Sequence, residues 1–214
     1  MANALLYTQS GGGKTCNSTL VTAPNRKKNL LICSDNSSIV LKNFDRKNLT
    51  IKNVGTVKDF IGEYQAGYTS NQYDNIILDN LSDLIDMWLL ELDESGKFRD
   101  FRQAYQLVYQ SLKRLTREST MLDCNTIFTA WSDNVEITLP TGEIAYRLQP
   151  KIPPKILDNV CGLMNVVAYI NTATDKDGNK RWYYVMEGTP TLMAKDQIAC
   201  RKNCMPEDLF TVTI

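Results

Sequence analysis

Residues 8–15 read TQSGGGKT and follow directly on the apolar residues 4–7, ALLY. A short apolar strand that runs into consecutive glycines, a lysine and a threonine is typical of a phosphate-binding loop. The glycines let backbone N–H groups close around phosphate oxygens, and the helix expected next adds its positive N-terminal end. We therefore expect a nucleoside triphosphate and Mg²⁺ here, with Lys14 on the β- and γ-phosphates and the Thr15 hydroxyl on the metal.

Thr8 departs from the usual pattern G-x-x-x-x-G-K-[ST], because it stands where the first glycine is normally found. A β-branched residue restricts the entry to the turn, so a glycine-rich turn with an incidental lysine is the alternative interpretation. The strand before the loop and the helix-compatible residues 16–21 after it favour the nucleotide site. The residues expected to contact the nucleotide are Thr8, Gln9, Ser10, Gly11, Gly12, Gly13, Lys14, Thr15 and Cys16.

The composition is that of an ordinary globular protein and narrows the chemistry. The 214 residues suit one domain, 1–214, and 43% of them are hydrophobic. The net charge is zero, so contact with nucleic acid requires a local basic patch. Histidine is absent, which excludes Ser-His-Asp and Cys-His catalysis. The chemistry must then use carboxylates, Lys, Arg, Tyr, backbone amides and a metal.

The sequence predicts a cytoplasmic protein. No apolar run approaches the ~20 residues that a membrane span requires, and residues 1–20 do not resemble a signal peptide. The six cysteines are scattered without a disulfide framework, and we expect them to be reduced.

Short apolar strands alternate with helical patterns, which predicts an α/β fold with a mostly parallel central sheet flanked by helices. The expected strands are 3–8, 29–34, 49–54, 74–79 and 125–130, and apolar stripes predict helices over 81–92 and 101–115. Residues 132–150 read as a loop or a hairpin, and 153–164 as a short helix. Residues 166–170 and 181–186, around a turn at 175–179, predict a C-terminal antiparallel hairpin.

Two carboxylates are expected beside the loop, since ligands bind at the carboxyl ends of strands in open α/β sheets. Asp79 ends an apolar strand and would hold Mg²⁺, whereas Asn80 is better placed to cap the helix that follows. Asp35 comes just after the second strand and could orient an attacking water. A simple turn residue in 34–37 is an equal alternative for Asp35.

The order of these elements resembles a RecA-type ATPase core, and more closely the compact phage nucleotide-binding proteins related to RecA, some of which anneal single strands. The resemblance rests on residues 5–7 leading into 11–15 and on 73–81, and extends to 126–131, 149–152 and 191–196. It implies a RecA-like P-loop core that binds ATP and Mg²⁺ and assembles on single-stranded DNA as a ring or filament. A single-strand binding protein is a further implied partner.

The same resemblance implies roles for individual residues. Asp35 falls where a catalytic glutamate stands and is one methylene shorter. Thr129 lies on the strand that carries a γ-phosphate sensor. Lys195 falls in a Lys-x-Arg-like motif that reaches a neighbouring subunit's nucleotide; Gln197 occupies the arginine position, and Arg201 is an alternative arginine.

Two basic segments are candidates for DNA binding. Lys97, Arg99 and Arg102 interleave with Phe98, Phe101 and Tyr105, and basic groups with aromatic faces suit a single strand. Core packing is nevertheless the favoured interpretation for Phe101 and Tyr105. The second segment, 132–150 and its flank, contributes Arg147 and Lys151.

The leading hypothesis is an ATPase, stimulated by single-stranded DNA, that promotes recombination or strand annealing. One alternative is a DNA-annealing module whose nucleotide site does not hydrolyse ATP. Another is a P-loop helicase loader or packaging-associated ATPase.

Overall fold

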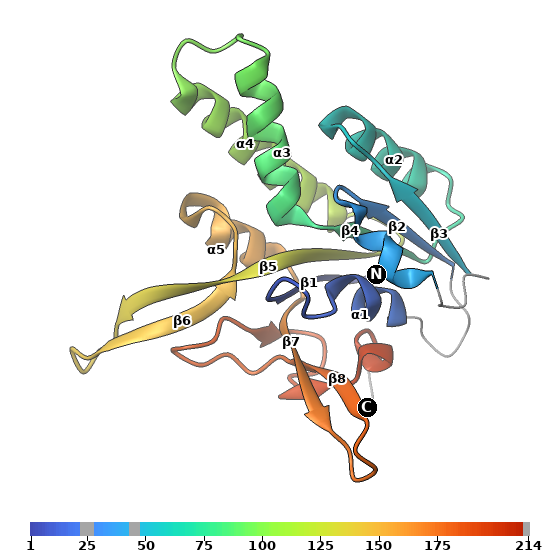
Figure 1. The fold of residues 1–214 in the computed structure, drawn as a ribbon, viewed down its shortest axis with the longest axis vertical. Coiled ribbons are helices and arrows are strands. Elements are labelled where there is room, and N and C mark those ends of the chain that lie inside the picture. Colours follow the sequence, from blue (N-terminus) through green and yellow to red (C-terminus); the bar gives the residue numbers. More distant parts are fainter. Residues whose placement is uncertain (22–27, 43–47, 212–214) are drawn as a thin grey trace.

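One large sheet organises the computed structural model, which describes residues 1–21, 28–42 and 48–211 (Figure 1). In spatial order its main strands are β10 (Asn203–Cys204), β8 (Lys180–Val185), β7 (Val166–Thr174), β1 (Asn3–Thr8), β5 (Asn125–Thr138), β4 (Asn75–Asp79), β2 (Asn29–Cys33) and β3 (Leu49–Asn53). β6 (Ile144–Pro150) pairs with β5, and β9 (Lys195–Asp196) pairs with β7. Strands β7, β1, β5, β4, β2 and β3, which are neighbours in this order, run parallel to one another. Strands β8 and β10 extend the sheet beyond β7 with antiparallel pairing.

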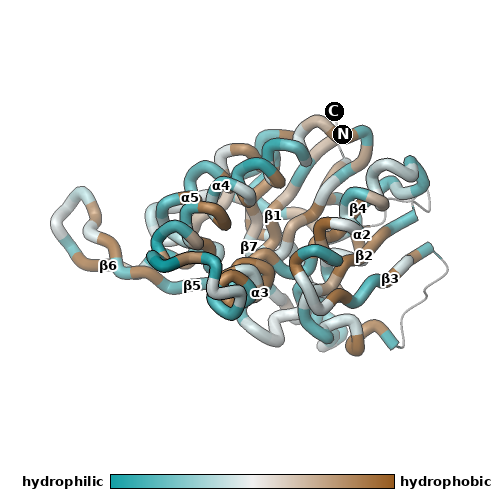
Figure 2. The backbone as a smooth tube through the Cα atoms, turned by 90° about the horizontal axis from the view of Figure 1, so that it is seen from above, coloured by the Kyte–Doolittle hydropathy of each residue, from teal (hydrophilic) through white to brown (hydrophobic). Residues whose placement is uncertain are grey.

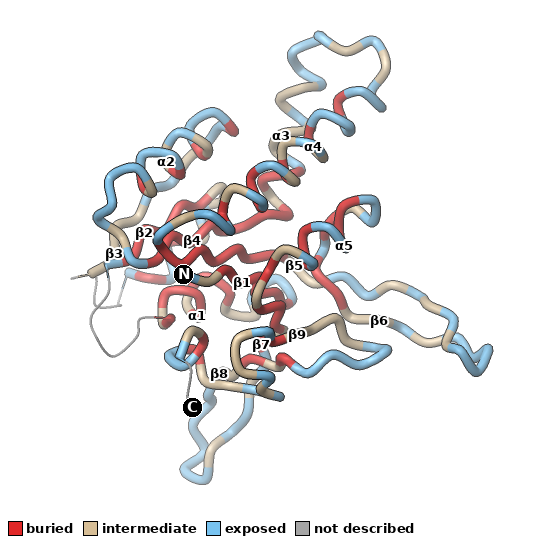
Figure 3. The backbone as a smooth tube through the Cα atoms, turned by 180° about the vertical axis from the view of Figure 1, so that it is seen from behind, coloured by how far each residue is buried: buried red, intermediate tan, exposed pale blue. Residues whose placement is uncertain are grey.

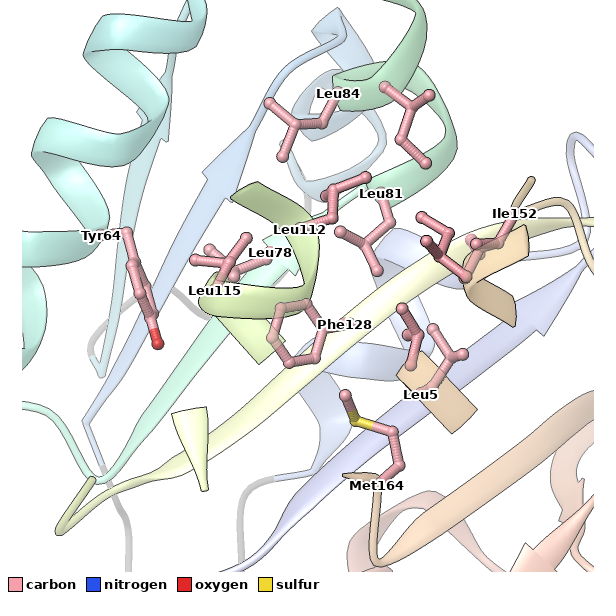
Figure 4. Packing of buried hydrophobic residues seen from close by; sticks show 14 of the residues in the cluster. Leu5, Tyr64, Leu78, Leu81, Leu84, Leu112, Leu115, Phe128, Ile152 and Met164 are labelled. Carbon is pink, nitrogen blue, oxygen red and sulfur yellow. The ribbon is translucent and has the colours of Figure 1, made fainter. Parts of the chain in front are cut away.

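Helices cover both faces of this sheet. They are α1 (Lys14–Leu20), α2 (Val57–Thr69), α3 (Leu81–Glu94), α4 (Phe101–Ser119) and α5 (Pro154–Leu163), with the short 3₁₀ helices η1 (Asn36–Leu41) and η2 (Pro206–Asp208). Residues of α2, α3, α4 and α5 share one apolar cluster with the sheet, part of which is drawn in Figure 4. Residues in and next to α1, η1 and η2 pack in a second cluster on the opposite face.

The central strands bury side chains on both faces because successive residues point in opposite directions. In β1, Leu5 and Tyr7 pack under α5 and its neighbours, while Ala4 and Leu6 belong to the cluster around α1. Figure 3 shows this buried centre and the exposed hairpins around it, and Figure 2 shows apolar residues along the inner strands. These double-sided strands explain the near-continuous apolar runs in the sequence, and the predicted α/β architecture is confirmed.

Three local features differ from the expectations or sharpen them. Helix α2 has no counterpart among the predicted elements. Residues 132–150 form a hairpin and not a loop, because β5 continues to Thr138 and pairs with β6; it projects from the rest of the chain (Figure 2). The core interpretation of Phe101 and Tyr105 is wrong, since both are 38% exposed and α4 enters the core only from Ala104 and Val108 onward.

A row of buried asparagines joins the strands at the edge of the sheet where they begin. Asn29, Asn75 and Asn125 are aligned in register on β2, β4 and β5. Asn75 donates to the Asn29 side chain at 2.8 Å, and Asn125 donates to the Asn75 side chain at 2.9 Å. Asn3 and Asn165 exchange two further bonds between backbone N–H and side-chain oxygen. The row aligns these strands, so that their carboxyl ends meet at one place.

Candidate nucleotide site

The carboxylate of Asp79 lies where the ends of β4, β5 and the phosphate loop converge. Its Oδ2 accepts hydrogen bonds from Thr15 Oγ1 at 2.6 Å and from Ser37 Oγ at 2.9 Å. Its Oδ1 accepts one from Thr129 Oγ1. The sheet thus brings together three of the predicted residues, Asp79, Thr15 and Thr129. Ser37, which reaches the site from η1, was not among the predicted site residues.

Burial governs the charges of this site. Asp79 is only 1% exposed, and burial raises the pKa of its carboxyl, against the three hydroxyl hydrogen bonds that lower it. Burial also lowers the pKa of Lys14, while the nearby Asp79 and Asp35 act in the opposite direction. Lys14 Nζ donates to the Gln9 carbonyl at 3.4 Å. A buried carboxylate beside an ammonium that has only a weak partner is suited to a ligand that carries both a cation and phosphates.

The backbone of the loop is arranged for phosphate. Gly11 and Gly13 adopt φ of 76° and 87°, which side chains other than glycine rarely tolerate. Gly13 precedes the first turn of α1, and no side chain in the described residues caps it, so the first N–H groups of α1 stay open to a ligand. Hydroxyl and carboxylate oxygens are the ligands that Mg²⁺ prefers. Thr15, Asp79, Lys14 and the loop amides therefore fit a Mg²⁺–triphosphate group.

Asp35 lies at the carboxyl end of β2, next to this cluster. Its Oδ1 accepts from the backbone N–H of Ser37 at 3.0 Å, and its Oδ2 accepts from Asn80 Nδ2 at 3.2 Å. Asn80 Oδ1 in turn accepts from the Asp83 N–H at 2.8 Å, so Asn80 caps α3 as predicted. Asp35 is thus held as a turn residue and also lies near the Asp79 carboxylate, so the turn role does not conflict with the predicted role in orienting water, which stays a prediction.

A protein-family model described as an AAA domain matches residues 2–198. The chain belongs to this AAA-domain family. Among solved structures, a KaiC-like protein from the hyperthermophilic archaeon Pyrococcus horikoshii OT3 matches with 11% sequence identity and a TM-score of 0.49, over 88% of this chain and 79% of that one. No curated protein matches the chain.

Lys195 of the AAA-domain protein lies away from the phosphate loop of its own chain. It pairs with Val167, level with Leu5, and its Nζ donates to the Gly162 carbonyl at 3.1 Å. Thr8 stands three residues further along β1, about 10 Å at the usual rise of a strand. Contact between Lys195 and a nucleotide therefore requires a neighbouring copy, as the resemblance implies, and stays a prediction.

Arg201 is committed within its own chain. Its guanidinium donates to Asp196 Oδ2 at 2.7 Å and to the carbonyls of Asp208, Leu209 and Thr211. These bonds fasten the C-terminal segment to β9. The arrangement does not favour Arg201 as a substitute for the arginine that Gln197 replaces.

The predicted DNA-binding residues fall in two separate places. Lys97 and Arg99 lie in the connection between α3 and α4, and Arg102 is in the first turn of α4, paired with Asp100. Arg147 is on β6 and donates to the Pro190 carbonyl at 2.9 Å. Lys151 follows β6, with its ammonium 5.1 Å from the centre of the Trp131 ring. The predicted DNA-binding residues therefore lie on two separate surfaces, and DNA binding by either surface stays a prediction.

A groove of about 770 Å³ between α4 and α5 connects with the first of these surfaces. Arg102, Lys113 and Lys155 line it together with Tyr105 and Tyr109. The Tyr105 ring makes edge-on contacts with Phe101 at 5.2 Å and with Tyr109 at 5.9 Å. Lys155 and Tyr109 were missed from the sequence, because the groove combines two helices that are distant along the chain.

In the described part of the chain, no helix is long and apolar enough to cross a bilayer.

Proposed function

We propose that this AAA-domain protein binds ATP with Mg²⁺ and hydrolyses it in response to single-stranded DNA. The observation that carries the nucleotide half is the Asp79 carboxylate, which is buried and bonded to the Thr15 hydroxyl beside Lys14. Such a pair of oxygen ligands at the start of a helix, next to a buried lysine, is suited to holding a metal on phosphate oxygens.

Hydrolysis requires each residue to act on a defined atom. Thr15 and Asp79 would hold Mg²⁺, which neutralises charge on the β- and γ-phosphates. Lys14 and the loop N–H groups stabilise the charge that develops on the phosphate oxygens. Asp35 accepts a hydrogen bond from water, which attacks the γ-phosphorus as the bond to the bridging oxygen breaks and ADP leaves.

ATP turnover in Mg²⁺ tests this assignment. Lys14→Ala should reduce turnover at least a hundredfold, whereas Lys58→Ala, an exposed lysine on α2, should leave it unchanged. Asp35→Asn should lower kcat and leave the affinity for ATP within twofold, because Asn keeps the cap of η1 but is a weaker base. Equal turnover in wild type and Lys14→Ala would reject the site. ATP binding without turnover in the wild type would select the non-hydrolysing annealing module.

The α4–α5 groove supports the single-stranded DNA half of the proposal. Its three cations attract phosphates, and the exposed Tyr105 and half-buried Tyr109 can stack on bases without selecting a sequence. The acidic residues of α3 lie next to α4, so the expected binding is moderate and sensitive to salt.

Fluorescence anisotropy with a labelled oligo-dT strand tests the groove. Tyr105→Ala should weaken binding about tenfold and Lys113→Ala should reduce its salt dependence. Tyr146→Ala, an exposed tyrosine on the β5–β6 hairpin, and Lys58→Ala are the matched controls. Weakening by Tyr146→Ala alone would move the DNA site to the hairpin with Arg147 and Lys151. Loss of affinity in neither tyrosine variant would favour a helicase loader that binds a protein.

We further propose a role in recombination or strand annealing of phage DNA, with the protein assembled as a homo-oligomer and working beside a single-strand binding protein. Lys195 supports assembly, because only a neighbouring copy could bring its ammonium to a nucleotide. Specific ATPase activity that rises with protein concentration, and that Lys195→Ala makes independent of concentration, is the expected result. Activity proportional to concentration at every dilution would contradict assembly.

A further inference from the structure

A hollow of about 270 Å³ lies beside the phosphate loop, on the side opposite Asp79. Residues 8–12 form one wall, and β7 and β8 form the other. In the sheet, β7 borders β1 on one side, while β5 and β4 lie on the other (Figure 1). The cluster that fits Mg²⁺ and the terminal phosphates lies on the β4 side. The remainder of a bound nucleotide must therefore extend toward β7 and β8.

Trp182 of β8 stands against the loop itself. A Cβ atom placed on Gly13 would lie 3.0 Å from Trp182 Nε1 and 3.4 Å from Cε2, so the edge of the indole rests on the loop backbone. The indole N–H is a donor only, and it has no acceptor within the described residues. A donor that lies beside the end of a phosphate loop, with no acceptor among the described residues, is suited to a ligand oxygen.

Lys180 adds charge to the same wall. It is exposed, and among the described residues its ammonium forms no ion pair, whereas the adjacent Arg181 is paired with Asp175 at 2.9 Å. The residues that line the hollow include no carboxylate. The volume is slightly below the ~300–1,000 Å³ of sites that enclose a whole ligand, which fits a nucleoside whose phosphates lie in the loop.

We propose that the β7–β8 wall is the nucleoside subsite of this protein. Trp182 contacts the ribose and base and donates its indole N–H to a ribose oxygen, and Lys180 pairs with the α-phosphate. The assignment rests on the proposed nucleotide site and extends it, since it names Trp182 as the residue that distinguishes a nucleotide from bare polyphosphate.

Calorimetric titration with Mg·ATP and with Mg·tripolyphosphate, which lacks the nucleoside, tests this assignment. Trp182→Leu should weaken ATP binding about tenfold and leave tripolyphosphate binding within twofold. If Trp182→Leu folds poorly, Trp182→Phe is the variant to measure. It keeps an aromatic ring and loses the N–H, so it should weaken ATP binding by an intermediate factor. Lys180→Ala should weaken both ligands, because tripolyphosphate keeps a phosphate at the α position. Trp88→Leu on α3 is the matched control and should change neither.

The outcomes separate the two proposals. Lys14→Ala should weaken both ligands, and its failure to do so would overturn the nucleotide site itself. Wild-type protein that binds ATP no more tightly than tripolyphosphate, or a Trp182 variant that weakens both ligands equally or neither, would overturn the subsite while the nucleotide site stands.

Discussion

The buried carboxylate of Asp79 should make the ligand-free protein less stable than its neutral counterpart. In Asp79→Asn, the hydrogen bonds from Thr15 and Ser37 to one shared oxygen would pass from charge-assisted to neutral, at a cost of roughly 1 kcal/mol each. The amide nitrogen would replace the oxygen that accepts from Thr129, so that bond would reverse, with the amide donating to the hydroxyl. The opposing term is the removal of a charge from a fully buried position, and each buried ion carries a penalty of several kcal/mol. The raised pKa of Asp79 shows that burial outweighs the hydrogen bonds.

The pH dependence follows from the direction of that shift. A carboxyl whose pKa is raised on folding contributes stability below its ordinary pKa of 3.8, and this contribution is lost as the pH rises through the folded value. Above its folded pKa the wild type lacks this contribution, and Asp79→Asn, which cannot ionise, retains it. Without ligand the variant should therefore unfold at the same temperature as the wild type or higher, and its advantage should vanish below about pH 4.

Mg²⁺–ATP should reverse the order. A ligand present at a hundred times its Kd adds about 2.7 kcal/mol to the free energy of unfolding, which raises Tm by about 5–11 °C in a chain of this size. The wild type should show this shift in thermal melts, and Asp79→Asn should lose most of it, while Asp86→Asn on the exposed face of α3 should behave as wild type. A ligand-free variant that melts more than about 5 °C below wild type, or that keeps the full shift, would refute the reasoning.

Three other substitutions test separate parts of the structure. Gly12→Ala should lower ATP affinity in a titration without changing the circular dichroism spectrum, because the new Cβ would stand 2.5 Å from Thr8 Oγ1 and 3.0 Å from the Gln9 carbonyl. Phe128→Ala should cost about 3–5 kcal/mol in urea unfolding, since the ring is fully buried at the centre of the core, and a loss under 1 kcal/mol would contradict that packing. Burial alone would raise the pKa of Asp196, but Arg201 and three backbone N–H groups hold it below its ordinary value, so wild type should be more stable than Asp196→Asn at pH 7 and lose that margin below about pH 4; a margin that is constant with pH would exclude the ion pair.

The sequence predicted the elements whose signal is local. The strands that are buried on both faces read as apolar runs, and the glycines and lysine of residues 8–15 predict the phosphate loop. Helix α2 was missed because Gly62 and Gly67 interrupt it, although Val57, Phe60 and Tyr64 recur at helical spacing. The sequence does not distinguish a loop from a hairpin at 132–150, because the hairpin projects beyond the core and needs no apolar face.

The site was predictable up to the point where distant segments meet. Asp79, Thr15 and Thr129 could be placed from strand ends, since parallel strands finish at one edge. Ser37 could not, because its contact with Asp79 spans 42 residues and depends on how η1 folds back. Phe101 illustrates the converse error. The helical stripe is real, but the first turn of α4 lies outside the core, so Phe101 contacts the Tyr105 ring and stays 38% exposed.

The asparagine row at the opposite edge decides how accurately this site is assembled. A strand displaced by one residue would turn its apolar side chains to the wrong face, but a strand displaced by two would keep every side chain on the proper face. Hydrophobic burial alone cannot reject that second error. It would move Asp79 about 7 Å along its strand, far beyond the reach of the Thr15 hydroxyl. It would also separate the buried amides of Asn29, Asn75 and Asn125, at about 1–3 kcal/mol for each group left unsatisfied. The row thus selects the correct strand register at one end of the sheet, and the geometry of the site at the other end depends on that register.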